Sequence, residues 1–180
     1  LVSLVSGDRD LLQIATDKIK IRIPKTKKGG TQIEDYNTAD VIEKYGITPE
    51  QIIDLKGLMG DASDNIPGVP SIGEKTAVKI LTAYKTVEEA IENVDNIKPP
   101  RAANALKEHK DLALLSKKLA TIKTDCELDF TFNEAKLGDI FNEDAINLFR
   151  KLEFKSLITR VGSTSSTDND IDQKIIACDD

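Results

Sequence analysis

The chain of 180 residues is poor in histidine, cysteine and aromatic side chains, with one His, two Cys and 4% Phe, Trp and Tyr. Cys126 and Cys178 lie far apart, without a Cys-x-x-Cys pair or a nearby histidine, so neither a zinc site nor a disulfide framework is indicated. The apolar runs are short and interrupted, and no charged-then-apolar leader precedes a cleavage site. We therefore expect a globular, monomeric, cytoplasmic protein with no membrane partner.

Negative charge is concentrated at one end of the chain. The net charge is −6, and residues 161–180 alone carry −4, which leaves −2 on residues 1–160. Basic residues gather in two parts of that body: Lys18, Lys20, Arg22, Lys25, Lys27 and Lys28, then Lys75, Lys79 and Lys85. Each lysine taken singly fits a solvated strand or helix edge, but this segregation leaves a nucleic-acid partner open.

The first third of the chain has the pattern of an α/β fold. Residues 1–6 form an apolar, β-branched run that predicts a strand, followed by a turn and a short helix over 11–15. Residues 19–23 alternate apolar and basic side chains, which predicts a half-exposed strand before a loop over 25–30. A buried strand at the first residue needs neighbouring strands, so we expect the chain to be a piece of a longer protein.

The middle of the chain is predicted to be helical, from capping residues and apolar spacing. The expected helices cover residues 38–45, 48–58, 77–84, a short stretch after Thr86, 99–106, 111–120 and 142–152. Residues 126–132 alternate weakly, like a strand. Residues 161–180 have the polar composition of a linker.

Two pairs of aspartates are candidate ligands for a hard cation. Asp8 and Asp10 would share one face of an extended segment at the end of the first strand, or one of them caps the following helix. Asp61 and Asp64 would lie on one face of a helical turn, or they form Asx turns. Four carboxylates without histidine or cysteine favour Mg²⁺ or Mn²⁺ over Zn²⁺.

A glycine- and proline-rich segment, residues 66–77, follows the second pair directly. It nearly spells a nucleotide-binding P-loop, but Glu74 separates the second glycine from Lys75 and no buried strand precedes it. Two helices joined by a hairpin fit better. The free N–H groups at the start of the second helix, with Lys75, would then hold a phosphate of a nucleic-acid backbone.

These motifs, in order, resemble the 5′-nuclease family, which includes the flap endonucleases. The matching stretches are Ser6-Gly7-Asp8-Arg9-Asp10-Leu11, Gly60-Asp61-x-x-Asp64-Asn65-Ile66-Pro67-Gly68-Val69, Ile72-Gly73-Glu74-Lys75-Thr76-Ala77 and Leu152-Glu153-Phe154-x-Ser156-Leu157. The resemblance is strongest to the 5′ to 3′ exonuclease domain of bacterial DNA polymerase I. It implies an α/β, PIN-like fold: residues 1–160 would be the carboxyl-terminal portion of that domain, with a helix-hairpin-helix at about 48–84, and 161–180 a linker to a next domain.

The resemblance also implies functional residues. Asp8, Asp10, Asp61 and Asp64 would bind Mg²⁺ or Mn²⁺ at a two-metal centre. The DNA-binding hairpin would use Gly68, Val69, Ser71, Ile72, Gly73, Lys75 and Thr76, with a K⁺ ion on its backbone carbonyls. Ser71 stands where the family usually has glycine, which would weaken the hairpin if the position needs a positive φ.

The implied activity is metal-dependent hydrolysis of DNA from 5′ ends or flaps, in replication and repair. The family's remaining acids and its basic arch would precede Leu1, so we expect the fragment to be incomplete as an enzyme. The alternative is a non-catalytic helix-hairpin-helix DNA-binding module, in which the aspartates only form turns.

Overall fold

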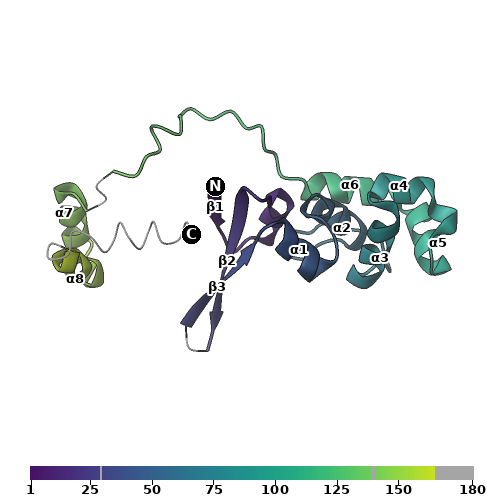
Figure 1. The fold of residues 1–180 in the computed structure, drawn as a ribbon, viewed down its shortest axis with the longest axis horizontal. Helices are drawn as coiled ribbons and strands as arrows, with labels where there is room; N and C mark the ends of the chain where they lie inside the picture. The colour runs from purple at the N-terminus through teal and green to yellow at the C-terminus, as the bar shows by residue number, and fades with distance from the viewer. Residues whose placement is uncertain (29, 139–140, 165–180) are drawn as a thin grey trace. The chain divides into compact units, whose positions relative to one another are not determined.

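The computed structural model describes residues 1–28, 30–138 and 141–164, which fall into two compact units. The first unit covers Leu1–Thr124 and the second begins at Asp125. In the first unit, a small sheet lies at one end and a series of helices extends from it (Figure 1). No helix in the described ranges is long and apolar enough to cross a membrane.

The sheet has three strands in the order β1-β2-β3: β1 (Val2–Val5), β2 (Ile19–Lys27) and β3 (Gly30–Tyr36). β1 and β2 are parallel, joined through the 3-10 helix η1 (Arg9–Ile14), whereas β2 and β3 form an antiparallel hairpin. Strands at the predicted positions 1–6 and 19–23 are confirmed, but β1 is mostly exposed and not buried as expected. The loop expected over 25–30 is wrong at both ends, because β2 continues to Lys27 and β3 begins at Gly30.

β3 was missed by sequence reasoning because its residues are mostly polar. It is held by cross-strand ion pairs: Arg22 lies 3.0 Å from Asp35, and Lys25 lies 2.7 Å from Glu34. Such pairs depend on the register between the two strands. A strand held by them lacks the apolar alternation by which a strand is recognised in a sequence.

The helices of the first unit lie near the expected positions. They are α1 (Thr38–Tyr45), η2 (Pro49–Gln51), α2 (Ile52–Met59), α3 (Glu74–Tyr84), α4 (Val87–Glu92), η3 (Val94–Asn96), α5 (Pro100–Glu108) and α6 (Lys110–Ala120). The exceptions are that α3 begins three residues earlier than expected and that η3 was not expected. Asn37 and Asp40 form a capping box at α1, which ends at Gly46 with φ 72°. The Thr86 side chain accepts the backbone N–H of Glu89 and starts α4, as its sequence pattern predicts.

α2 packs closely against α6 because α2 carries Gly57 at the contact. A Cβ at that position would lie 3.0 Å from the Cβ of Lys117. Beside it, the buried Asp54 carboxylate accepts the backbone N–H of Val87 and pairs with the Lys117 ammonium at 2.7 Å. Burial raises the pKa of Asp54, although the Lys117 and Val87 hydrogen bonds act in the opposite direction. The pair fixes α2, α4 and α6 together.

The second unit contains α7 (Glu143–Lys151) and α8 (Lys155–Thr164). α7 matches its prediction, and the Asn142 side chain caps it by accepting the N–H of Ala145. The strand expected over 126–132 is wrong: those described residues form no strand and their side chains are exposed. A weak alternation without a partner strand leaves backbone groups to water. α8 runs into the expected linker, and residues 165–180 lie outside the described ranges.

Candidate metal centre and DNA-binding hairpin

Asp10 is positioned by the first turn of η1. The Asp8 side chain is the N-cap of η1 and accepts the backbone N–H of Asp10 at 2.9 Å, while Leu12 is buried in the core and anchors the helix. Asp8 is itself exposed. Asp8 therefore caps a helix, as one of the two interpretations of the sequence predicts. The role of Asp8 as a metal ligand stays a prediction.

Asp61 and Asp64 lie on a tight loop after α2. The loop is closed by two backbone hydrogen bonds between Asp61 and Ile66, at 2.8 and 2.9 Å. Gly60 and Gly68, both at positive φ, cross so closely at its base that a Cβ on Gly68 would lie 2.2 Å from the Gly60 nitrogen. Only glycine fits this crossing. The loop thus fixes both acids relative to α2.

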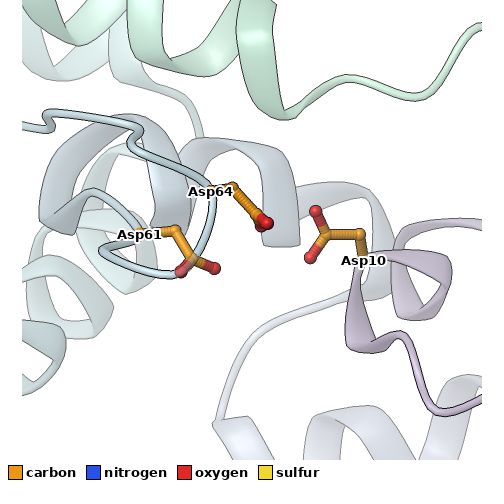
Figure 2. A group of neighbouring side chains, drawn as sticks. All are labelled: Asp10, Asp61 and Asp64. Carbon is orange, nitrogen blue, oxygen red and sulfur yellow. The ribbon is translucent and has the colours of Figure 1, made fainter.

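Asp10, Asp61 and Asp64 bring their carboxylates to one place (Figure 2). Each offers one oxygen, and these oxygens all lie within 4.8 Å of one another. Asp10 comes from η1 and the other two from the loop after α2, so the group joins residues some 50 positions apart. They line a cavity of about 480 Å³ that also includes Tyr45. Three oxygen ligands beside open solvent fit Mg²⁺ or Mn²⁺, with water completing the coordination shell.

A lysine that sequence reasoning missed lies among these carboxylates. The Lys56 ammonium contacts Asp10 and lies 2.8 Å from Asp61 and 3.7 Å from Asp64. Hydrogen bonds from Lys56 and then Ser63 lower the pKa of Asp61 to about 2. Burial opposes the charge on Lys56, but its bonds to Asp10 and Asp61 raise the pKa above the ordinary value. One lysine within a helix gives no sequence signal for such a position.

The hairpin between α2 and α3 is anchored by contacts with α6 and α2. The Gly68 N–H donates to the buried Ser116 hydroxyl at 3.0 Å, and the Val69 N–H donates to the Leu58 carbonyl at 2.8 Å. Val69 and Ile72 are buried, with 3% and 4% of their surface exposed. These two side chains therefore hold the hairpin in place and do not face a ligand.

The remaining predicted hairpin residues reach the surface. Ser71, Gly73 and Lys75 are exposed, and Thr76 is half-buried. α3 has no side-chain cap at Gly73 among the described residues, and in its first turn the Thr76 N–H donates to the Gly73 carbonyl at 3.0 Å. The N–H groups of Glu74 and Lys75 are then the ones left for a ligand. A Cβ on Gly73 would meet nothing within 4 Å, which leaves this end of the helix open to a phosphate.

Ser71 adopts the left-handed conformation that glycine favours, with φ 70°. Its hydroxyl accepts a hydrogen bond from the exposed Arg101 of α5 at 3.1 Å. Arg101 is a second residue that sequence reasoning missed, because 30 positions separate it from the hairpin.

Comparison with known proteins identifies the family. Residues 47–143, more than half of the chain, match the model described as 5′-3′ exonuclease, C-terminal SAM fold. The chain belongs to the 5′-3′ exonuclease family. The resemblance stated from the sequence motifs is confirmed, as is the α/β fold class.

One similar curated protein is DNA polymerase I of Bacillus caldotenax, which is 48% identical over 165 residues. The match covers 92% of this chain and 19% of that polymerase, so the chain spans about a fifth of the relative's length. Among solved structures, T5 5′-exonuclease with bound zinc aligns with a TM-score of 0.57 and 28% identity, covering 66% of this chain and 42% of that one. The T5 flap endonuclease in a complex with DNA and metal ions aligns with a TM-score of 0.56 and 27% identity, with the same coverage.

Proposed function

We propose that this chain supplies one side of a divalent-metal centre and a DNA-holding hairpin for a 5′ to 3′ exonuclease and flap endonuclease activity of the DNA polymerase I type. The observation that carries the proposal is the convergence of three carboxylates within 4.8 Å: Asp10 from η1, and Asp61 and Asp64 from the loop that leads into the hairpin. Two of the three cation ligands and the proposed phosphate-binding hairpin therefore belong to one continuous segment, and η1 supplies the third ligand.

The metal proposed is Mg²⁺ or Mn²⁺, because the ligands are carboxylate oxygens. When bound, such an ion activates water and stabilises the leaving oxygen of a phosphodiester. Asp10, Asp61 and Asp64 hold the cation, and Asp8 shapes the turn that presents Asp10. Three carboxylates are few for two metal ions, so the proposed two-metal centre needs further acids, and we expect the chain to be inactive alone.

The hairpin is proposed to hold the DNA backbone. The open first turn of α3 and the exposed Lys75 would bind one phosphate, without reading the base sequence. Backbone carbonyls of the hairpin would hold a K⁺ ion beside this phosphate. T5 flap endonuclease, whose solved complex contains DNA and metal ions, supports DNA as the ligand.

The second candidate is a DNA-binding module without catalysis. It is favoured by one observation: the Asp8 and Asp61 side chains accept backbone N–H groups of Asp10 and Ser63, as turn-forming aspartates do. In this alternative the acidic group binds no ion and only the hairpin has a function.

Metal titration separates the two candidates. We expect calorimetry to detect Mg²⁺ or Mn²⁺ uptake by the chain, and Asp61→Asn to abolish it, whereas the exposed Asp95→Asn, in η3, leaves it unchanged. Uptake that is absent, or that survives Asp61→Asn, would favour the non-catalytic module. Hydrolysis of a 5′-flap substrate with Mg²⁺ tests completeness, since robust cleavage abolished by Asp61→Asn would refute the need for further acids.

DNA binding is tested by fluorescence anisotropy with a 5′-flap duplex at several salt concentrations. We expect affinity to fall as salt rises, and Lys75→Gln to weaken binding and reduce the salt slope by about one. Lys107→Gln, an exposed lysine on α5, serves as the control. Affinity that does not depend on salt would contradict a phosphate-holding hairpin.

A further inference from the structure

Lys56 lies in the position that a cation would take among the three carboxylates. Its ammonium contacts Asp10 and lies 2.8 Å from Asp61 and 3.7 Å from Asp64, while only 12% of its side chain is exposed. An ammonium has three donors, so one lysine can bond to three acids from two separate segments. Lys56, which lies on α2, thus joins η1 to the loop after α2.

The three carboxylates need a positive charge beside them. Like charges whose oxygens lie within 4.8 Å disfavour ionisation of one another, and an ammonium or a divalent ion removes that cost. The same oxygens cannot serve both cations fully. An ion coordinated at 2.0–2.6 Å by these oxygens, typical of Mg²⁺ and Ca²⁺ sites, would also be repelled by an ammonium that stayed in contact with them. Lys56 and the metal are therefore alternatives at one place.

We propose that Lys56 is a built-in counter-cation of the acidic group, which a divalent ion must displace in order to bind. This inference rests on the proposed metal centre and adds a residue that sets its affinity. Without metal, Lys56 holds Asp10 beside Asp61 and keeps the site assembled. With metal, the flexible four-carbon stem carries the ammonium aside, and the cavity of about 480 Å³ along Tyr45 and Met59 has room for it.

The proposal predicts how removal of the charge changes metal affinity. The measured affinity of an ion equals its affinity for the free site multiplied by the fraction of molecules in which the site is free, so a competing ammonium lowers it. Lys56→Met keeps an unbranched side chain of similar length but has no ammonium. We therefore expect Lys56→Met to bind Mn²⁺ about tenfold more tightly than the parent chain, with Mg²⁺ shifted in the same direction.

Stability gives a second readout that does not depend on activity. In EDTA, Lys56→Met leaves three carboxylates without their cation, so its unfolding midpoint should fall below that of the parent chain. Addition of Mn²⁺ should raise the midpoint of the variant more than that of the parent, because the ion replaces the missing charge. A lysine with a merely structural role would give a loss that metal does not repair.

The experiment is calorimetric titration of the 180-residue chain with Mn²⁺, then with Mg²⁺, combined with thermal unfolding in EDTA and in excess metal. The variants are Lys56→Met, Lys56→Gln in case the first does not fold without metal, and Lys79→Met as an exposed lysine control on α3. Tighter binding by either Lys56 variant, with Lys79→Met unchanged, is the result expected.

Two outcomes would overturn the inference, and they can be told apart. If the parent chain binds Mn²⁺ through Asp61 but the Lys56 variants bind equally or more weakly, Lys56 is a support for the metal and not its competitor, and the proposed function stands. If neither the parent nor any variant binds Mn²⁺, the metal centre fails together with the inference.

Discussion

The Arg101 guanidinium donates a hydrogen bond to the Ser71 hydroxyl across 3.1 Å, and Ser71 holds a backbone φ of 70°. A left-handed conformation costs an L-residue about 1–2 kcal/mol, whereas glycine adopts it freely. Serine therefore carries a conformational cost at the hairpin tip. The Ser71 hydroxyl offsets part of that cost, because it accepts the hydrogen bond that links the hairpin to α5. Glycine could not make this contact.

Substitutions at Ser71 separate the backbone cost from the hydrogen bond. Ser71→Ala and Ser71→Gly both remove the hydroxyl, but only glycine also relieves the positive φ. We expect the glycine variant to have a free energy of unfolding about 1 kcal/mol higher than the alanine variant. Denaturant unfolding measures the difference. Equal stabilities would mean that the backbone at residue 71 is not left-handed in solution.

The crossing of Gly60 and Gly68 predicts a large effect of one methyl group. In Gly68→Ala the new Cβ would lie 2.2 Å from the Gly60 nitrogen at a φ of 63°, so we expect a loss of stability above about 3 kcal/mol. Gly73→Ala is the matched control in the same hairpin, because its Cβ meets nothing within 4 Å and should cost less than about 1 kcal/mol. Similar losses in both variants would contradict the close crossing.

The buried pair of Asp54 and Lys117 predicts unequal effects for two adjacent lysines. Lys117→Met leaves the Asp54 carboxylate, 3% exposed, without its cation, and we expect a loss of about 3–5 kcal/mol in unfolding free energy. Lys118→Met, on the exposed side of α6, should change it by less than about 0.5 kcal/mol. The double variant Asp54→Leu, Lys117→Leu should recover part of the loss. No recovery would indicate that the pair also matters for packing.

The β2–β3 hairpin predicts a dependence of stability on acid pH. Hydrogen bonds from Lys25, then Tyr36 and Lys44, lower the pKa of Glu34 from 4.5 to about 2. Because the folded pKa is the lower one, this stabilisation is present above pH 4.5 and is lost as the pH falls toward 2. We expect the stability difference between the parent chain and Glu34→Gln to narrow across that interval. Unfolding followed by circular dichroism at several pH values measures the difference, and a difference that stays constant from pH 4.5 to 2 would contradict these hydrogen bonds to Glu34.

Helix ends and the family could be predicted because their causes are local. The glycine that ends α1 and the Thr86 cap each depend on residues within four positions. The motifs around Asp61 and the hairpin are equally local, because their glycines and prolines adopt the backbone conformations that one tight loop requires. These features led from the sequence to the 5′-nuclease resemblance and to the candidate acids.

What only the tertiary structure decided depends on residues far apart in the chain. The sequence contains no sign that Lys56 enters the acidic group, that Ser116 holds the hairpin or that Arg101 reaches Ser71, because each contact forms only after helices have packed. β3 likewise depends on ion pairs across a register set by its neighbour. Local propensity and turn geometry act within a few residues, so the sequence determined the elements and the motif. Packing then decided which side chains meet: three of the four predicted aspartates lie together with a lysine.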